Sequence, residues 1–382
     1  MFVKSLLLGA LSLGITTAAS QTTVDSLTIG ALDFNPYLYQ PFKQYVKCPA
    51  TDRSDPANPK PIPGGLKLAY LDINPLAKKT LVLVHGWPSL WTTYREQIKF
   101  FGKDYRLIIP ENRGFGDSEH PVNLNGSNTF NDFVGDVTCM MDHSKVTKGV
   151  CVGNDFGAQV CWEAGRSRPD RFPAVFNVGT PYIAPVAPFL PSSALAIVNP
   201  HFSYQIYLGD HPDLAATEMN ADIRKSIRSC AQTAKSGVPA DFLVSTTSFL
   251  GPWNTYLAAN NLTQIPASGI MSQVVEDYMV YSYSKQGFYN TYNGYQYLNR
   301  KTTFDFGVAQ GNLTIPQPTF TLRPTADPVA DWIALAVRVR EADYLPMHQT
   351  AEIATSHWPH EEKPDEFNKI LSDWLISIKT YF

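Results

Sequence analysis

The stretch that decides the fold reads Val150-Cys151-Val152-Gly153-Asn154-Asp155-Phe156-Gly157-Ala158. Its apolar start predicts a buried strand, and the small residues Gly153, Gly157 and Ala158 allow a sharp turn into a closely packed helix, the pattern of a nucleophile elbow. Asp155 lies at the tip of this turn. Because a helix N-terminus presents free N–H groups and the positive end of its dipole, we expect the carboxylate to be ionised. A solvated aspartate in a glycine-rich connection is the alternative.

Similar apolar runs recur along the chain, separated by segments of helix length. They are Leu81–Val84, Leu107–Ile109, Val150–Val152, Val175–Val178 and Phe320–Leu322. Strands buried on both faces of a parallel sheet have this pattern. The sequence therefore predicts an α/β fold with a mostly parallel central sheet flanked by helices. Leu66, Leu68, Tyr70 and Ile73 predict edge strands ahead of the first run.

The alternation stops between Val178 and Phe320, where helical segments at 212–234 and 269–284 lie among many tyrosines. We expect an N-terminal arm without regular structure over 21–65, a first part of the core over 66–180, a helical cap over 181–300, and a second part of the core over 301–382. Ligands would then bind in the crevice at the carboxyl ends of the strands. Two independent domains in series would leave the last strand without a sheet.

The charge of the chain excludes one class of partner. Its 382 residues carry 31 Lys+Arg and 34 Asp+Glu, a formal net charge of −3. With no excess of positive charge, nothing attracts nucleic acid or anionic lipid. We therefore expect no nucleic-acid partner.

Residues 1–20 have the pattern of a secretory signal peptide. A basic start at Met1–Lys4 precedes an apolar run at Ser5–Ala19, and Ala18-Ala19-Ser20 offers a cleavage site. A membrane anchor is the alternative, but a spanning helix needs roughly 18–20 apolar residues. We expect a secreted protein, glycosylated at the sequons of Asn125, Asn261 and Asn312 in a host with that machinery.

Five cysteines follow the signal, so at least one thiol is unpaired. Cys151 and Cys161 lie in the elbow strand and the following helix, where we interpret them as small buried apolar residues. Cys48 and Cys230 lie in more polar stretches and could bridge. The sequence alone leaves the pairing of these two and of Cys139 open.

Five motifs occur in a fixed order along the chain. They are His85-Gly86-Trp87-Pro88, Arg113-Gly114-Phe115-Gly116-Asp117-Ser118, the Asp155 elbow, Thr180-Pro181 and Ser356-His357-Trp358. From about Leu66 to the C-terminus the chain thereby resembles the α/β-hydrolase fold, and within it the epoxide hydrolase branch with an aspartate nucleophile. The resemblance implies a helical cap, or lid, inserted into the core.

Aspartate at the elbow suits substitution at a saturated carbon. A carboxylate forms an ester there, which water can cleave, whereas a serine would form an ether. This chemistry favours epoxides or organic halides as substrates. Haloalkane dehalogenases typically place a halide-binding Trp after the nucleophile, and Phe156 has no N–H to offer a halide.

Chain order in this fold is nucleophile, acid, histidine. The resemblance makes His357 the general base and Asp327, just past the late strand, the acid that orients it; Asp331 is the alternative. His360 and the neighbouring acids lack the spacing of a metal site, so we expect neither metal nor cofactor.

The resemblance also assigns the groups that contact reacting oxygens. Backbone N–H groups of Trp87 and Phe156 would form the oxyanion hole, with a cis Trp87–Pro88 bond and His85 shaping the loop. Two cap tyrosines would hydrogen-bond the epoxide oxygen: Tyr204, and Tyr295 or alternatively Tyr292. Gly294 and Gln296 depart from the Trp and Arg that are frequent in the family.

We therefore expect a secreted epoxide hydrolase that converts a small apolar epoxide and water into a vicinal diol. A haloalkane dehalogenase is the alternative enzyme. A non-catalytic, hydrolase-like protein that binds a ligand is the alternative from another class, but it has no use for a nucleophile, an acid and a histidine together.

Overall fold

The computed structural model describes residues 34–186 and 188–382. The predicted signal peptide lies outside them. The strands are β1 (Lys43–Cys48), β2 (Thr51–Asp52), β3 (Lys60–Pro61), β4 (Leu66–Ile73), β5 (Thr80–Val84), β6 (Arg106–Pro110), β7 (Val150–Asn154), β8 (Val175–Val178), β9 (Thr319–Pro324) and β10 (His348–Ile353).

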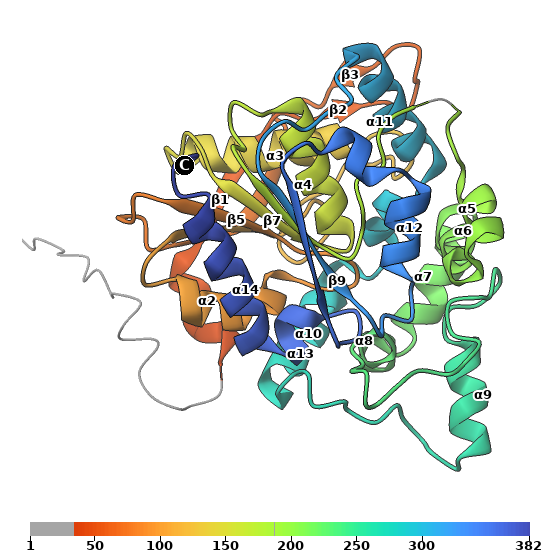
Figure 1. Ribbon diagram of the computed structural model, residues 1–382. Helices are drawn as coiled ribbons and strands as arrows, with labels where there is room; N and C mark the ends of the chain where they lie inside the picture. The colour runs from red at the N-terminus through yellow and green to blue at the C-terminus, as the bar shows by residue number, and fades with distance from the viewer. Residues whose placement is uncertain (1–33, 187) are drawn as a thin grey trace, which may run out of the picture.

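Within the described residues, eight of these strands form one sheet in the order β1-β4-β6-β5-β7-β8-β9-β10. β4 is antiparallel to both of its neighbours, and the pairs from β6 to β10 are parallel. The mostly parallel sheet predicted from the apolar runs is thus confirmed (Figure 1).

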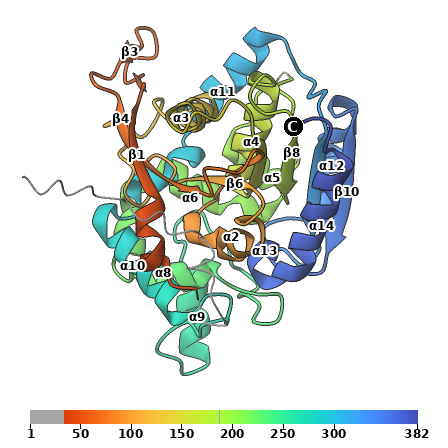
Figure 2. The same cartoon turned by 90° about the vertical axis from the view of Figure 1, so that its left-hand side faces the viewer.

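Helices cover both faces of the sheet (Figures 1 and 2). Those of the core are α2 (Arg95–Phe101), α3 (Phe130–His143), α4 (Phe156–Ser167), α12 (Trp332–Arg338), α13 (Pro359–Glu362) and α14 (Pro364–Ser377), with the 3₁₀ helices η1 (Pro36–Phe42), η2 (Trp91–Tyr94) and η5 (Glu341–Tyr344). Among them, α3 is fixed at its start by a capping box of Thr129 and Asp132.

The side chains of one strand alternate between two cores. Leu81 and Leu83 of β5 join Ile98 of α2 and Leu371 of α14 in one hydrophobic cluster. Val82 and Val84 join the residues of α3 and α4 in the other. Successive side chains of a strand point to opposite faces of the sheet, and helices cover both faces. Because every residue of the strand is therefore buried, its sequence is a continuous apolar run.

The segment between β8 and β9 forms the cap. It contains α5 (Ser192–Val198), α6 (Tyr204–Asp210), α7 (Pro212–Asn220), α8 (Ile223–Cys230), α9 (Gly251–Ala259), α10 (Gln273–Gln286) and α11 (Tyr297–Gln310), with η3 (Pro200–Phe202) and η4 (Tyr289–Tyr295). The predicted cap boundary at residue 300 falls inside α11. Among the described helices, none combines the length and apolar composition needed to cross a membrane.

We expected the N-terminal arm to lack regular structure, and this prediction was wrong. Its residues Lys43–Cys48 form β1, which pairs with β4 along its whole length. β4 is therefore the second strand of the sheet rather than its edge. Only three-dimensional pairing reveals this, because the exposed face of β1 leaves it without a continuous apolar run.

The cysteine interpretation was also wrong. Disulfides join Cys48 to Cys139 and Cys151 to Cys161, and Cys230 is the free cysteine. The first joins β1 to α3, which pack against each other. The second joins the elbow strand to the helix after it, with Cα atoms 5.5 Å apart, a separation that suits a disulfide.

Candidate active site

The turn at Asp155 is held by close backbone contacts. Asp155 has φ 55° and ψ −121°, which is uncommon for a residue other than glycine. A Cβ atom on Gly153 would lie 2.3 Å from the Gly157 carbonyl oxygen, and one on Gly157 would lie 2.0 Å from the Val84 carbonyl oxygen. The two glycines therefore let β7, α4 and β5 approach closely enough to fix the carboxylate at the carboxyl end of the sheet.

Two neighbours contact the Asp155 carboxylate. The Trp87 N–H donates to Oδ1 at 2.8 Å, and His357 Nε2 lies 3.4 Å from Oδ2. The Trp87–Pro88 bond is cis, as the resemblance implied. Among the described residues, the Asp155 side chain accepts no hydrogen bond from the first backbone N–H groups of α4, so the Phe156 N–H is not engaged with it.

The structure brings Asp327, not Asp331, to His357. Asp327 Oδ2 lies 2.8 Å from His357 Nδ1 and also accepts from the Trp332 indole N–H at 2.7 Å. Asp331 instead caps α12 through the Ala334 N–H. Burial disfavours the charged imidazole, but the carboxylates of Asp327 and Asp155 outweigh it and raise the pKa of His357 to about 10.

His85 and His360 do not contact Asp155 and instead hold neighbouring segments in place. His85 is buried, its Nε2 accepts from the Asn112 N–H at 3.1 Å, and burial lowers its pKa to about 4. Its neutral ring thus supports the loop that carries Trp87. His360 Nε2 lies 2.7 Å from Thr93 Oγ1. Within residues 34–186 and 188–382, no three His, Cys, Asp or Glu side chains group as metal ligands.

Tyr204 and Tyr295 pack around the indole of Trp87. Tyr204 stacks on it with ring centroids 6.4 Å apart, and Tyr295 meets it edge-on at 5.6 Å. The two tyrosine rings are 5.7 Å from each other. Burial, reinforced for both by the charge of Asp155, raises the pKa of each hydroxyl. Both therefore keep the proton that a hydrogen-bond donor needs.

Tyr292, the alternative to Tyr295, points elsewhere. Its hydroxyl contacts Met219 Sδ at 3.3 Å in the cap interior, and its side chain lines neither cavity that reaches Asp155. Of the two candidate tyrosines, Tyr295 is therefore the one that lines the cavity beside the nucleophile.

The two departures from the family pattern have physical explanations. A Cβ atom on Gly294 would lie 1.4 Å from the Phe156 ring, so this ring occupies the space that a side chain at 294 would fill. Phe156 is held there by Phe130 and Phe133, with ring centroids 5.0 and 5.2 Å away. The Gln296 amide donates to backbone carbonyls of Leu208 and Tyr292.

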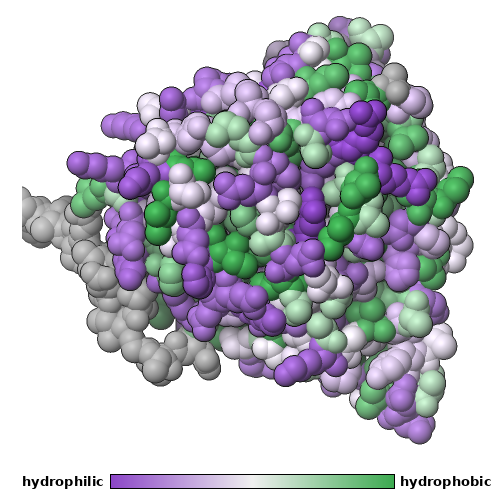
Figure 3. Space-filling view, viewed as in Figure 1, coloured by the Kyte–Doolittle hydropathy of each residue, from purple (hydrophilic) through white to green (hydrophobic). Residues whose placement is uncertain are grey.

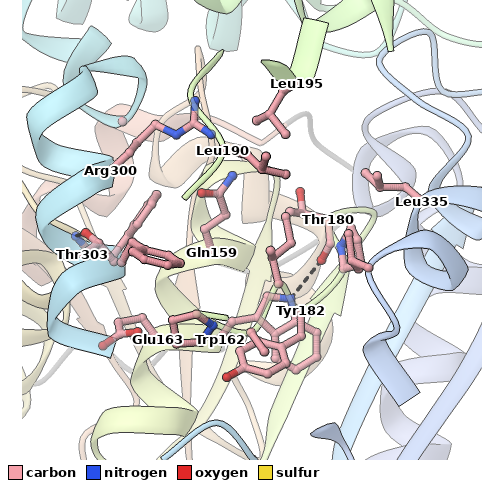
Figure 4. A pocket seen from close by; sticks show the side chains of 18 of the residues that line it. Gln159, Trp162, Glu163, Thr180, Tyr182, Leu190, Leu195, Arg300, Thr303 and Leu335 are labelled. Atoms are coloured by element: carbon pink, nitrogen blue, oxygen red, sulfur yellow. Dashed lines mark hydrogen bonds between the residues drawn. The ribbon is translucent and has the colours of Figure 1, made fainter. Parts of the chain in front are cut away.

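Asp155 and Tyr204 lie between two cavities. The larger has a volume of about 700 Å³ and is lined by α4, α11 and residues 181–186 and 188–190 (Figure 4). The smaller, about 40 Å³, also touches His357, Cys230 and Trp87. A space of this size with several polar groups suits a water molecule.

Residues 79–364 match the family model described as "alpha/beta hydrolase fold". The chain belongs to this alpha/beta hydrolase family. Among curated relatives of this hydrolase, epoxide hydrolase A of Mycobacterium tuberculosis is 25% identical over 82% of this chain and 96% of its own length. Mouse bifunctional epoxide hydrolase 2 is 21% identical over 81% of this chain, which spans only 54% of the mouse protein.

Solved structures share the fold of this hydrolase. Epoxide hydrolase A from Mycobacterium thermoresistibile has a TM-score of 0.67 at 20% identity, covering 86% of this chain and 98% of its own. An epoxide hydrolase from an endophytic Streptomyces has a TM-score of 0.70 at 19% identity, and the match covers 88% of this chain and 96% of the Streptomyces chain.

Sequence reasoning missed two features of the hydrolase site. The Trp87 indole serves as the platform for both tyrosines, and Arg300 of α11 lines the larger cavity. No motif marks either role, since an arginine in an amphipathic segment is usually a solvated residue. Only the tertiary structure, in which α11 packs against α3 and η4, shows that Arg300 lines this cavity.

Proposed function

We propose that this protein is an epoxide hydrolase that forms a covalent ester on Asp155. The observation that carries the proposal is that one carboxylate, Asp155, shares the larger cavity with two protonated tyrosines, Tyr204 and Tyr295, and lies 3.4 Å from His357 on the side of the smaller cavity. The similarity to curated epoxide hydrolases over four-fifths of the chain supports the same reaction.

In the first step, a carboxylate oxygen of Asp155 attacks an epoxide carbon and the C–O bond of the ring breaks. Tyr204 and Tyr295 donate hydrogen bonds to the leaving oxygen, which makes it a better leaving group. The new alkoxide gains a proton and the His357 imidazolium loses one. Because the ester has no charge, only Asp327 still raises the pKa of His357, which favours the neutral, basic imidazole.

In the second step, His357 removes a proton from water, and the hydroxide attacks the ester carbonyl of Asp155. The smaller cavity beside His357 has room for this water. The Trp87 N–H is placed to stabilise the negative charge that develops on Oδ1. Collapse of this intermediate restores the carboxylate and releases a vicinal diol.

The site is less suited to dehalogenation. The Phe156 ring packs against Phe130 and Phe133, and the Trp87 indole N–H donates to Thr291 Oγ1 at 3.0 Å. Neither the residue after the nucleophile nor the tryptophan that contacts the nucleophile therefore offers a free indole N–H to a halide.

Trapping the ester tests the proposal. The His357→Gln variant, mixed with a neutral epoxide such as styrene oxide, should accumulate one substrate mass on Asp155, because alkylation proceeds and hydrolysis does not. Wild-type protein cycled in heavy-oxygen water should incorporate the label into the Asp155 side chain. Steady diol formation with position 155 never modified would contradict the mechanism, and halide release without any diol would favour a dehalogenase.

We also propose that the protein is secreted and glycosylated. The N-terminal pattern and two disulfides suit an oxidising compartment, and the Asn261 sequon lies on an exposed turn. When the full chain is expressed in a secreting eukaryotic host, we expect the protein in the medium. Treatment with a glycosidase should lower its mass, and Asn261→Gln should remove part of that glycan mass. Retention of unmodified protein inside the cell would argue against both.

A further inference from the structure

Arg300 lies in the larger cavity without a carboxylate to balance its charge. Figure 4 shows it extending from α11 toward Leu190 and Leu195, across from Gln159 of α4. Its guanidinium donates to Ser192 Oγ at 2.5 Å. Among the described residues, none provides a carboxylate within ion-pair distance of Arg300, and the side chain that accepts its hydrogen bond is this neutral hydroxyl.

The acids that line the same cavity are already paired. In the described part of the chain they are Asp155 and Glu163. Asp155 faces His357, and Glu163 contacts Arg166 at 2.6 Å. The rest of the wall near Arg300 is largely apolar, including Leu195, Phe304 and Leu190. Of the other arginines that line the cavity, Arg166 and Arg340 have carboxylate partners, and Arg338, which has none among the described residues, is exposed to solvent. The cavity thus combines an apolar surface with one partly buried arginine, Arg300, that has no carboxylate partner there.

Leaving a guanidinium partly buried without an anion is unfavourable. Burial lowers the pKa of Arg300 to about 10, which still leaves it charged at neutral pH. A planar guanidinium pairs with a carboxylate through two parallel hydrogen bonds, and a single charge balances a single charge. A phosphate monoester, with a charge of about −1.5 to −2, would need further donors.

We infer that the substrate is an aliphatic epoxide that carries a carboxylate, and that Arg300 binds this carboxylate while the epoxide lies between Asp155 and the tyrosines. The inference rests on the proposed function and adds the substrate class to it. A volume of about 700 Å³ far exceeds the needs of a three-membered ring, so most of the cavity contacts the remainder of the substrate.

The cavity also has an opening that suits an amphiphile. Ile183, Val186 and Leu190 line it and are 54%, 45% and 48% exposed, so the wall reaches the surface at this segment. Apolar residues lie among hydrophilic ones on the side of the molecule that carries α5 and α12 (Figure 3). An apolar chain can therefore enter while its charged end meets Arg300.

The test compares a long-chain epoxy acid with its methyl ester, which has the same epoxide and chain but no charge. Both are measured with wild-type protein, Arg300→Gln and Lys301→Gln. Lys301 is the matched control, because it is the next residue of α11 and pairs with Asp305 on the surface. Each variant removes one positive charge from the same helix.

We expect wild type to prefer the acid in kcat/KM by roughly 10- to 100-fold, the size of a charge-assisted pair, mainly through a lower KM. Arg300→Gln should lower kcat/KM for the acid at least about ten-fold more than kcat/KM for the ester, so that the preference is lost, and Lys301→Gln should keep the wild-type preference. Equal kcat/KM for acid and ester in wild type would overturn the inference without touching the proposed function, since diol still forms. An equal loss on both substrates in Arg300→Gln would also overturn it, because Arg300 would then act through the tyrosines. The wild-type comparison holds even if the variant fails to fold.

Discussion

His357 lies between two carboxylates that have different fates in the proposed reaction. Asp155 loses its charge on alkylation, whereas Asp327 keeps it and remains 2.8 Å from Nδ1. Asp327→Asn should therefore slow hydrolysis of the ester far more than its formation, by about 100-fold or more, the range of a lost general base. Rapid quenching should show the ester accumulating during turnover. Equal slowing of both steps would contradict the assigned role, and Asp331→Asn, at the cap of α12, is the matched control.

The same cluster gives stability a pH dependence. Folding raises the pKa of His357 from 6.5 to about 10. A group whose pKa is higher in the folded state contributes its full stabilisation of the fold at pH values below its pKa in the unfolded chain. This stabilisation is lost as the pH rises through its pKa in the folded protein. The difference in free energy of unfolding between wild type and His357→Gln should thus shrink from pH 6.5 to 10. Urea unfolding across this range measures it, and a constant difference would be the contrary result.

The two tyrosines can be tested against a third from the same region. Tyr204→Phe and Tyr295→Phe should each lower the rate of alkylation by about 100-fold, as when one preorganised donor is removed, and the double variant should be inactive. Tyr292→Phe should turn over like wild type, because its hydroxyl contacts only Met219 in the cap interior. An active double variant would mean that other groups meet the epoxide oxygen.

At the scale of elements, η4 of the cap packs directly on the start of α4. Gly294→Ala places a methyl group inside the Phe156 ring and should lower the free energy of unfolding by about 1–3 kcal/mol, as overpacking does. Activity should fall with it, since Tyr295 is the next residue. Chemical denaturation measures the loss, and Phe156→Ala in the same chain should restore part of it.

Gly135→Ala provides the comparison. It lies inside α3 with nothing within 4 Å of an added Cβ, so it should raise stability by about 0.5–1 kcal/mol. Destabilisation of similar size at both glycines would contradict the packing argument.

Elements were predicted with unequal success. β5, β6, β7, β8 and β9 coincide with the apolar runs, because strands buried on both faces leave a continuous signal in the sequence. β10 was missed, since most of its residues are only partly buried or exposed. β1 was missed for the same reason, and with it the position of β4 inside the sheet.

At the scale of the whole molecule, the Cys48–Cys139 disulfide ties the arm to the core across 91 residues. Replacing both cysteines by alanine should lower the free energy of unfolding by about 2–5 kcal/mol, mainly because the unfolded chain regains freedom. Equilibrium denaturation tests this. Alkylation of the denatured, unreduced wild type should label a single thiol, that of Cys230; three labelled thiols would mean that one disulfide does not form.

The sequence by itself determined the five buried parallel strands and the elbow, because a continuous apolar run and a glycine-rich turn are patterns of residues that are close in the chain. The order of nucleophile, acid and histidine followed from the ordered motifs that carry the family resemblance. Tertiary structure alone decided which cysteines pair, and that Arg300 has no carboxylate partner among the described residues. It also showed that Asp327 rather than Asp331 contacts His357, and that Tyr295 rather than Tyr292 lines the cavity that reaches Asp155. Each of these depends on distances between elements far apart in sequence, which no local periodicity encodes.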